Sequence, residues 1–355
     1  MLKRVFPQLH FMDFLLVFVP ITIAAYYSGL PDIVTFILAA VGIAGLSHVI
    51  VESTSIIAQR ASNTVSALIN ATFGNAIEFM IAIFSLRLGL VELVKASIIG
   101  SIIINVLLLI GLSMVFGGLK YKEQKFNKDS AGVSSTMLII VVVGLVLPSM
   151  FNLVENKSVQ AVSVAVSIVL GIVYILSLFY TLGTHKHLFM VEREVSPKPL
   201  AHRWPFAAAV IALLISIGLA SFTSDILVKT INPLIDKMHF TEQFVGLVII
   251  ALLTNIPEHL SAIIFARKNN MTLSLEIGMS SALQIALFVV PILVLLSTAL
   301  TGTTLNLVFG PFALAALVVT AMIANYISSD GVCHWLEGAQ LTAVYLLIAI
   351  AFYFI

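Results

Sequence analysis

The sequence predicts an all-α membrane protein of about eleven transmembrane helices, arranged as one accessory helix plus two inverted five-helix repeats. Three observations support this prediction. The chain is 60% apolar with a mean hydropathy of +1.11 over 355 residues, its long apolar runs are separated by short polar connections, and two glutamate-bearing segments recur 180 positions apart. A soluble fold could not cover its surface with so few polar side chains, and runs of about 18 or more apolar residues are typical of membrane-spanning helices.

The apolar runs between turn and charge signals define the expected helices. They cover 12–29, 32–58, 63–87, 91–118, 131–151, 158–182, 205–231, 241–267, 271–300, 303–327 and 335–355. We expect the basic, apolar N-terminus to be retained as the first membrane helix rather than cleaved as a signal peptide. The predicted domains are an accessory helix in 1–30, a first repeat in 31–182, a cytoplasmic linker in 183–204 and a second repeat in 205–355.

The distribution of positive charge predicts the orientation of the chain. With the N-terminus inside, thirteen of the eighteen Lys and Arg residues fall in inside segments and five in outside segments. Cytoplasmic loops carry an excess of Lys and Arg. We therefore predict a cytoplasmic N-terminus and a C-terminus outside, although two basic loops supply eight of the thirteen and could account for the bias alone.

Two matching segments place one glutamate each in the middle of an expected helix. They read NATFGNAIEFMIA and ALLTNIPEHLSAI, in which Asn75 precedes Glu78 and Asn255 precedes Glu258 by three positions. A carboxylate at bilayer depth costs about 2.5–3.5 kcal/mol even on the lenient insertion scale. Because this cost is borne twice at matching positions, the two glutamates indicate a bound cation.

The number of helices between the two glutamates determines the symmetry of the repeats. Glu78 lies in the third expected span and Glu258 in the eighth, so the second repeat begins an odd number of spans after the first and crosses the membrane in the opposite direction. Inverted repeats are typical of secondary transporters whose binding site lies near the bilayer midplane. We therefore expect both glutamates in one central site.

Hydroxyl and amide side chains extend the two glutamates into an all-oxygen set of candidate cation ligands. Residues three and four apart share a helix face, so each asparagine lies on the face of its glutamate. Each glutamate is followed after 23 positions by a serine, Ser101 or Ser281. The polar stripes around these serines include Asn105 and Gln284. Such oxygens without a thiolate suit a hard cation such as Ca²⁺, which takes about six to eight oxygen ligands.

Backbone carbonyls could complete this ligand set. Gly74 and Pro257 weaken the two helices next to the glutamates, and Pro257 leaves the carbonyl four residues earlier without its helical partner. Irregular backbone at membrane depth is tolerated where it lines a polar cavity. For Gly74 alone, close helix packing is an equally good explanation.

The same pair of carboxylates predicts proton coupling. Two carboxylates that share a buried site favour protons when no cation is bound. A divalent cation would expel those protons, so Ca²⁺ and protons compete for Glu78 and Glu258. This competition is the minimum requirement for exchange.

Four motifs carry a resemblance to a known family. NATFGNAIE, GSIIINVLLLIGLSM, SALQIALFVVP and ISSDGVCHWLEGAQLTAVYLL resemble the cation/proton (Ca²⁺/H⁺) exchanger family of the calcium/cation antiporter superfamily, over nearly the whole chain. The resemblance implies one extra helix before two inverted five-helix repeats, with Ca²⁺ bound by Glu78 and Glu258. The further ligands it implies are Gly74, Thr254, Ser101, Ser281 and Asn105.

Three short stretches depart from the family pattern. The second motif reads Thr-Asn-Ile-Pro at 254–257 instead of a repeated Gly-Asn-Ala, Ser280 replaces the glycine before Ser281, and Cys333 with His334 replaces a Ser-Asn pair. The glutamates are intact, so these differences concern ion affinity and selectivity.

We predict a secondary antiporter, and not an enzyme, that exchanges Ca²⁺ or another divalent cation for protons by alternating access in the cell membrane of a prokaryote. Ca²⁺ is the transported ligand, no permanent cofactor is expected, and the sequence allows a homo-oligomer. A net charge of +1 argues against nucleic-acid binding. A Na⁺/Ca²⁺ exchanger of the same superfamily is the alternative, since Na⁺ also binds oxygens. An intramembrane metalloenzyme is the alternative of another class, but HExxH and GxSxG motifs are absent from the sequence.

Four other polar residues have open roles. Glu52 and Asp225 are candidates for the ion pathway or, alternatively, for interfacial positions. His259 is a candidate proton relay, although a hydrogen-bonded structural histidine fits as well. Glu276 is expected to be solvated near the inside face.

Overall fold

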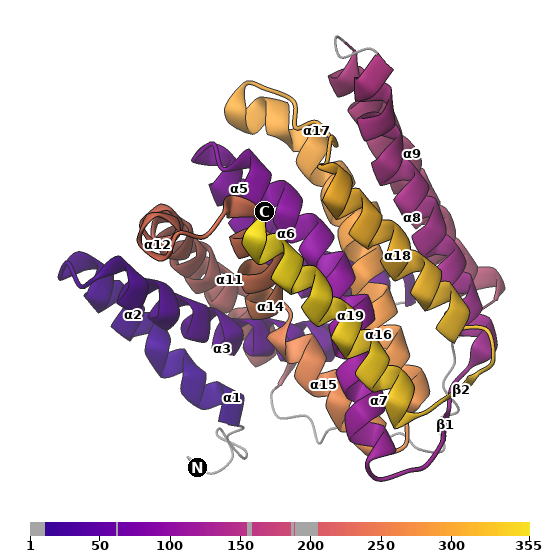
Figure 1. Ribbon diagram of the computed structural model, residues 1–355. Helices are drawn as coiled ribbons and strands as arrows, with labels where there is room; N and C mark the ends of the chain where they lie inside the picture. The colour runs from indigo at the N-terminus through magenta and orange to yellow at the C-terminus, as the bar shows by residue number, and fades with distance from the viewer. Residues whose placement is uncertain (1–10, 62, 155–157, 186–187, 189–204) are drawn as a thin grey trace, which may run out of the picture. The chain divides into compact units, whose positions relative to one another are not determined.

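The computed structural model describes residues 11–61, 63–154, 158–185, 188 and 205–355, and this part of the chain is almost entirely helical (Figure 1). The chain divides into two compact units. Unit 1 comprises Met1–Phe84 and Glu192–Phe240, and unit 2 comprises Ser85–Val191 and Thr241–Ile355. Each unit thus takes segments from both predicted repeats, and most of the predicted linker 183–204 lies outside the described residues. The predicted domain boundaries stay a prediction.

Unit 1 is built around the long helix α3. Its elements are α1 (Phe11–Phe14), the 3₁₀ segment η2 (Leu15–Val17), α2 (Phe18–Tyr27), α3 (Asp32–Ala58), α4 (Asn63–Gly74), most of α5 (Ala76–Arg87), α11 (Phe206–Lys229) and α12 (Ile231–Met238). Helix α3 packs against α2, α4 and α11. A Cβ on Gly45 of α3 would lie 3.0 Å from Leu15, so this glycine lets the first membrane helix approach closely.

Unit 2 holds the remaining helices and one small sheet. Its first elements are α6 (Val91–Ile103), the π-helix η3 (Ile104–Leu109), α7 (Ile110–Gly118), β1 (Gln124–Lys125), α8 (Lys128–Val154), α9 (Val159–Phe179) and the π-helix η4 (Tyr180–Thr184). After unit 1's second segment follow α13 (Glu242–Phe244), the π-helix η6 (Val245–Ile250), α14 (Ala251–Thr254), α15 (Ile256–Arg267), α16 (Met271–Gln284), the π-helix η7 (Ile285–Val289), α17 (Val290–Thr301), α18 (Pro311–Ile327), β2 (Val332–Cys333) and α19 (Trp335–Phe354).

In the part of the chain that the structure describes, seven continuous helical stretches are long and apolar enough to cross a membrane. They are Asp32–Ala58, Val91–Gly118, Lys128–Val154, Val159–Thr184, Phe206–Met238, Met271–Thr301 and Trp335–Phe354. The bent pair Glu242–Thr254 and Ile256–Arg267 forms an eighth, and two shorter apolar helices cover Met12–Tyr27 and Pro311–Ile327. With the pair α4 and α5, these elements correspond one to one with the predicted spans. The all-α membrane fold is therefore confirmed.

The outer faces of the helices are apolar, as a lipid environment requires. Helix α9 shows this clearly, because its large apolar side chains Ile175, Leu176 and Phe179 are each more than 60% exposed. In water such a surface would favour aggregation, whereas in a bilayer it contacts acyl chains.

Glycines bring the backbones of α6 and η6 together inside unit 2. A Cβ on Gly100 would lie 2.4 Å from the carbonyl oxygen of Leu247, and a Cβ on Gly246 would lie 2.5 Å from that of Leu93. Neither position could hold a larger residue without a backbone shift. Small residues at such contacts are typical of membrane helix packing, and here they join a helix of the first repeat to one of the second.

A short antiparallel sheet fixes the loop after α7, a feature that the sequence analysis did not predict. In this sheet Gln124 of β1 pairs with Cys333 of β2. The Gln124 side chain also donates hydrogen bonds to the Ala266 carbonyl oxygen (2.8 Å) and to Asn269 Oδ1 (3.1 Å). Burial raises the pKa of the Cys333 thiol to about 12. The segment that reads as a basic surface loop is thus partly buried against the end of α15.

Candidate cation site

Both glutamate-bearing helices are broken at the asparagine that precedes the glutamate. Helix α4 ends at Gly74 and α5 begins at Ala76, and α14 ends at Thr254 and α15 begins at Ile256. The second break bends the span by 57°. Asn75 and Asn255 therefore occupy equivalent breaks.

The breaks place each glutamate in the first turn of a new helix. Glu78 lies in the first turn of α5 and Glu258 in that of α15. A helix N-terminus carries unsatisfied N–H groups and a partial positive charge, which stabilise a nearby carboxylate. Pro257 occupies the start of α15, where its missing N–H has no cost.

Unit 1 contributes Gly74, Asn75 and Glu78. Asn75 is 5% exposed and its carbonyl oxygen accepts a hydrogen bond from the Phe79 N–H (3.1 Å), while Glu78 is half-buried. No heavy atom of the described residues lies within 4 Å of a Cβ built on Gly74. Among the described residues no close helix contact at Gly74 is seen, so the break is the better explanation of this glycine.

Unit 2 contributes a buried network centred on Asn255, which is fully buried. Its side-chain Nδ2 donates to the Ala251 carbonyl oxygen (2.8 Å) and to Thr254 Oγ1 (3.1 Å), both on the helix before the break. Its Oδ1 accepts from Asn105 Nδ2 at 2.7 Å. Asn255 therefore fixes the end of α14 and joins it to η3.

The two predicted serines lie in the same network. Asn105 Nδ2 also donates to Ser281 Oγ (2.9 Å), Ser281 Oγ donates to Asn255 Oδ1 (3.4 Å), and Asn255 Nδ2 lies 3.5 Å from Ser101 Oγ. The structure thus brings together residues from η3, α6, α16 and the break between α14 and α15 that are up to 180 positions apart in the sequence. Gly278 permits this approach, because a Cβ there would lie 2.7 Å from the Asn105 carbonyl oxygen.

Among the candidate cation ligands of unit 2, two buried side-chain oxygens have no hydrogen-bond partner among the described residues. They are Oε2 of Glu258 and Oδ1 of Asn105. A buried polar oxygen without a partner is costly, by about 1–3 kcal/mol, and more for a charged group. A buried carboxylate oxygen without a partner calls for a proton or a cation.

The other candidate residues of unit 2 have clear positions. His259 Nδ1 lies 2.7 Å from the Asn255 carbonyl oxygen, as expected for a hydrogen-bonded structural histidine. Gln284 Nε2 donates to Ser280 Oγ (3.1 Å), and Gln284 lines a cavity together with Glu276. The assignment of Gln284 to the central site stays a prediction.

The two candidate pathway residues lie in unit 1. Glu52 Oε2 lies 3.9 Å from His48 Nε2, which is also 4.0 Å from Asp13 Oδ1. Asp225 forms a 2.7 Å ion pair with Lys229 one turn along α11. Both carboxylates thus have basic neighbours on their own helices. Their role in ion passage stays a prediction, as does a shared site for Glu78 and Glu258, which belong to different units.

The sequence analysis did not predict the two π-helical segments η3 and η7. Asn105 lies in η3 and Gln284 directly precedes η7, so the two equivalent helices each contain a π-helical segment next to the candidate ligands. Such segments are frequent at functional sites, because they rotate side chains relative to the preceding α-helix. An apolar run such as INVLLL carries no signal that separates π from α geometry.

Comparison with known proteins identifies similar chains. The family model described as sodium/calcium exchanger protein matches residues 31–183 and 208–354. The chain is 36% identical to a "Ca(2+)/H(+) antiporter" of Aphanothece halophytica over 360 residues, covering 96% of this chain and 95% of that protein. It is also 36% identical to the "Ca(2+)/H(+) antiporter ChaA" of Bacillus subtilis, covering 94% and 96% of the two chains. The solved structure of native YfkE superposes with a TM-score of 0.84 at 33% identity, covering 98% of this chain and all of that chain.

Proposed function

Because the chain belongs to the sodium/calcium exchanger protein family, we propose that it is a secondary antiporter that exchanges Ca²⁺ for protons across a membrane. Its curated relatives with 36% identity over nearly the whole chain are Ca²⁺/H⁺ antiporters, which supports protons rather than Na⁺ as the counter-ion. It performs no chemical conversion. Ca²⁺ and H⁺ are its substrates.

The observation that carries this proposal is the broken helix α14–α15 with its glutamate. Asn255 lies at the break, and Glu258, in the first turn of α15, has a buried carboxylate oxygen without a partner among the described residues. Ca²⁺ takes about six to eight oxygens and prefers carboxylates, carbonyls and hydroxyls. We assign Glu78 and Glu258 as the charged ligands, with neutral ligands from the carbonyls of Gly74 and Thr254 and from Asn105.

The asparagines at the breaks have a supporting role. Both ends of the Asn255 amide already hold hydrogen bonds within unit 2. Asn255 therefore positions the carbonyl end of α14 and the start of α15, and Asn75 occupies the equivalent break in unit 1. Ser101 and Ser281 contact the same network through Asn105 and Asn255.

Exchange follows from the charge of the site. With two carboxylates and no cation, the site would carry two negative charges at membrane depth, which is costly. Either one Ca²⁺ or protons remove this charge. Only a neutralised site can therefore pass between its inward-open and outward-open states, and this condition couples Ca²⁺ movement to proton movement in the opposite direction.

The inverted repeats supply the two states. Repeats of opposite orientation around a midplane site allow alternating access by movement of one bundle against another. The two separate segments matched by one family model, residues 31–183 and 208–354, support the predicted repeats at 31–182 and 205–355. We place the N-terminus in the cytoplasm and the C-terminus outside, in the cell membrane of a prokaryote.

Flux measurements in proteoliposomes test the proposal. We expect an imposed pH difference to drive Ca²⁺ movement in the absence of Na⁺, and the Glu258→Gln variant to abolish it. Ca²⁺ flux that requires Na⁺ and ignores the pH difference would instead assign the chain to Na⁺/Ca²⁺ exchange. Empty liposomes and liposomes with the Glu123→Gln variant, which alters an exposed loop carboxylate, serve as controls.

A further inference from the structure

One side of α3 packs against the first membrane helix of unit 1, which consists of α1, η2 and α2 (Figure 1). Gly42, Gly45, His48 and Glu52 follow one another on α3 at intervals of three or four residues, so they lie on the same side of that helix. A Cβ on Gly42 would lie 3.2 Å from a side chain of α2, and a Cβ on Gly45 would lie 3.0 Å from Leu15 of η2. His48 and Glu52 therefore continue the side of α3 that touches the first membrane helix.

Three side chains of metal-ligating type converge at the end of this helix contact. Asp13 belongs to α1, and His48 and Glu52 lie one turn apart on α3. His48 Nε2 lies 4.0 Å from Asp13 Oδ1 and 3.9 Å from Glu52 Oε2, and one ligand atom from each residue lies within 4.8 Å of the other two. Among the described residues, no other three His, Cys, Asp or Glu side chains are grouped in this way. We call this group the Asp13–His48–Glu52 cluster.

The spacing within the cluster is that of ligands around a shared ion. An N–H···O hydrogen bond holds its nitrogen and oxygen about 2.7–3.2 Å apart, and both distances from His48 Nε2 are longer than this. Two ligands of one ion, each about 2.0–2.6 Å from it, lie about 3–5 Å apart. The distances from His48 Nε2 to the two carboxylates fall in this range, so the three side chains surround a position that one ion can occupy.

The donor set selects the class of ion. Imidazole nitrogen with two carboxylates suits Zn²⁺ and other divalent ions of the first transition row, whereas Ca²⁺ takes about six to eight oxygens. Three protein ligands with water in the open position are a common arrangement around Zn²⁺. The three side chains are only 13–25% exposed, so solvent and salt screen their attraction for an ion less than at an open surface.

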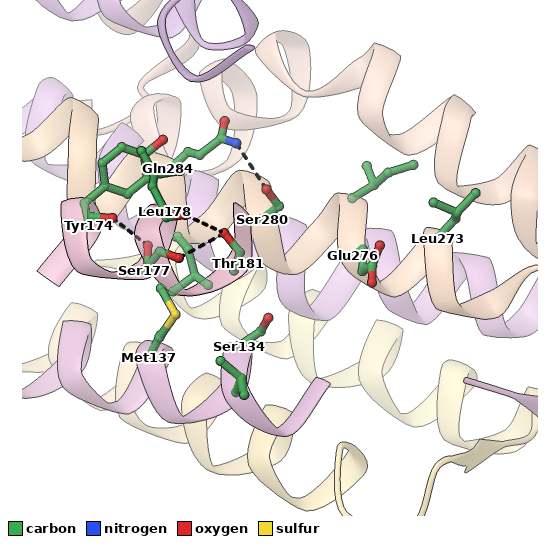
Figure 2. A pocket seen from close by; sticks show the side chains of 13 residues that line it. Ser134, Met137, Tyr174, Ser177, Leu178, Thr181, Leu273, Glu276, Ser280 and Gln284 are labelled. Atoms are coloured by element: carbon green, nitrogen blue, oxygen red, sulfur yellow. Dashed lines mark hydrogen bonds between the residues drawn. The ribbon is translucent and has the colours of Figure 1, made fainter. Parts of the chain in front are cut away.

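Single carboxylates elsewhere in the molecule lack these features. Glu276 lines a cavity of about 370 Å³ between α8, α9 with η4, and α16 (Figure 2). The expectation that Glu276 is solvated is wrong, because its Oε1 is buried and its carboxylate interacts with the Ser130 side chain of α8. Among the described residues that line this cavity, Glu276 is the one acidic residue and there is no histidine. The cavity therefore lacks the mixed ligand set of the Asp13–His48–Glu52 cluster.

His334 provides a second comparison, because it also has two carboxylates near it. Its Nδ1 lies 3.6 Å from Glu337 Oε2 and its Nε2 lies 3.9 Å from Glu123 Oε1. One imidazole binds a given ion through one nitrogen, so these carboxylates do not share an ion with His334. At His48 both carboxylates approach the same nitrogen.

We propose that Asp13, His48 and Glu52 bind a divalent transition-metal ion such as Zn²⁺, which joins the first membrane helix to α3. The ion neutralises the two carboxylates and takes the lone pair of His48 Nε2. This site shares no residue with the central cation site, and the inference does not depend on the proposed function. Because the ligands come from two helices that meet only in the folded protein, the bound ion stabilises the fold.

Calorimetric titration of Zn²⁺ into the purified, metal-free full-length protein tests the site. We expect a binding component that His48→Asn weakens by more than about a hundredfold, since the loss of a ligand costs more than the loss of an outer-shell partner, which costs about 10–100-fold. Asp13→Asn, which removes a charged ligand on the other helix, should weaken the same component. Zn²⁺ binding that is unchanged in His48→Asn, or is absent from the parent protein, would overturn the proposal.

Two control variants locate the binding. His334→Asn makes the same substitution at a histidine whose carboxylates lie on opposite ring nitrogens, and asparagine keeps a side-chain acceptor at the start of α19. It should leave Zn²⁺ binding unchanged. Glu258→Gln should also retain the component that His48→Asn removes, and so should the parent protein in excess Ca²⁺. Loss of that component in Glu258→Gln would place Zn²⁺ in the central site and overturn the proposal.

Thermal unfolding gives an independent readout of the same site. Zn²⁺ at about 100 times its dissociation constant should raise the melting temperature of the parent protein and of His334→Asn, but not that of His48→Asn or Asp13→Asn. Melting in EDTA shows that each variant is folded before Zn²⁺ is added, so a lost response reflects lost binding. An equal rise in the parent protein, His48→Asn and Asp13→Asn would contradict the proposal.

Discussion

Replacing Asn255 with alanine should destabilise the protein more than any other single change in the polar network. The Asn255 side chain makes three good hydrogen bonds, of 2.7, 2.8 and 3.1 Å. A hydrogen bond in a membrane protein contributes about 0.6–1 kcal/mol. We therefore expect Asn255→Ala to lower the free energy of unfolding by about 2–3 kcal/mol.

The assay is equilibrium unfolding in mixed lipid and detergent micelles, followed by the loss of helical circular dichroism. Ser101→Ala is the matched control, since Ser101 Oγ takes part through one long contact of 3.5 Å. It should cost about 0.5 kcal/mol or less. Comparable destabilisation by the two substitutions would refute the reasoning that Asn255 fixes the helix break.

A double-mutant cycle with Asn105→Ala sharpens this test. If the 2.7 Å contact between the two amides is a real bond, the two single effects should exceed the double effect by about 1 kcal/mol. Strictly additive effects would mean that the helix break and η3 are energetically independent.

Three further predictions concern other parts of the chain. Glu78→Gln and Glu258→Gln should each abolish Ca²⁺ flux in proteoliposomes, because the amide keeps the shape of the side chain and loses its charge. Size-exclusion chromatography should show that both variants stay folded. Flux at the parent rate would exclude that glutamate as a central ligand. Gly278→Ala should lower the free energy of unfolding by about 1–3 kcal/mol, because its Cβ would lie 2.7 Å from a carbonyl oxygen of η3. The control Gly132→Ala, which has open space around it, should not lower it. Equal melting temperatures for these two variants would contradict the close contact at Gly278. Because burial raises the pKa of Cys333 to about 12, its contribution to stability is complete below the ordinary thiol pKa of about 8.5 and decreases as the pH rises above it; a Cys333→Ala variant should lack this alkaline decrease in melting temperature.

The sequence predicted those features whose residues are energetically unfavourable in their surroundings. The apolar runs predict the spans because a membrane tolerates little else, and the glutamates with Gly74 and Pro257 predict the two breaks because each is unfavourable inside an apolar helix. Both inferences depend on local composition alone. The structure places the breaks one residue after Gly74 and two residues before Pro257.

The remaining features depend on contacts between distant segments. The pairing of Gln124 with Cys333 and the bond between Asn105 and Asn255 each join residues more than 140 positions apart, and nothing in either local sequence specifies the partner. The burial of Glu276 was missed for the same reason. A glutamate near the end of a predicted span is ordinarily solvated, but here α16 packs against α8 and the Glu276 carboxylate interacts with Ser130 of that helix.

The central claim, that Ca²⁺ and protons compete for the same carboxylates, is tested most directly by the pH dependence of Ca²⁺ binding together with the protons released. The account predicts that the Ca²⁺ affinity of the central site falls as the pH falls, that Ca²⁺ binding releases protons into a weakly buffered solution, and that Glu258→Gln removes both effects. A tight Ca²⁺ affinity that is independent of pH, with no proton release, would contradict it.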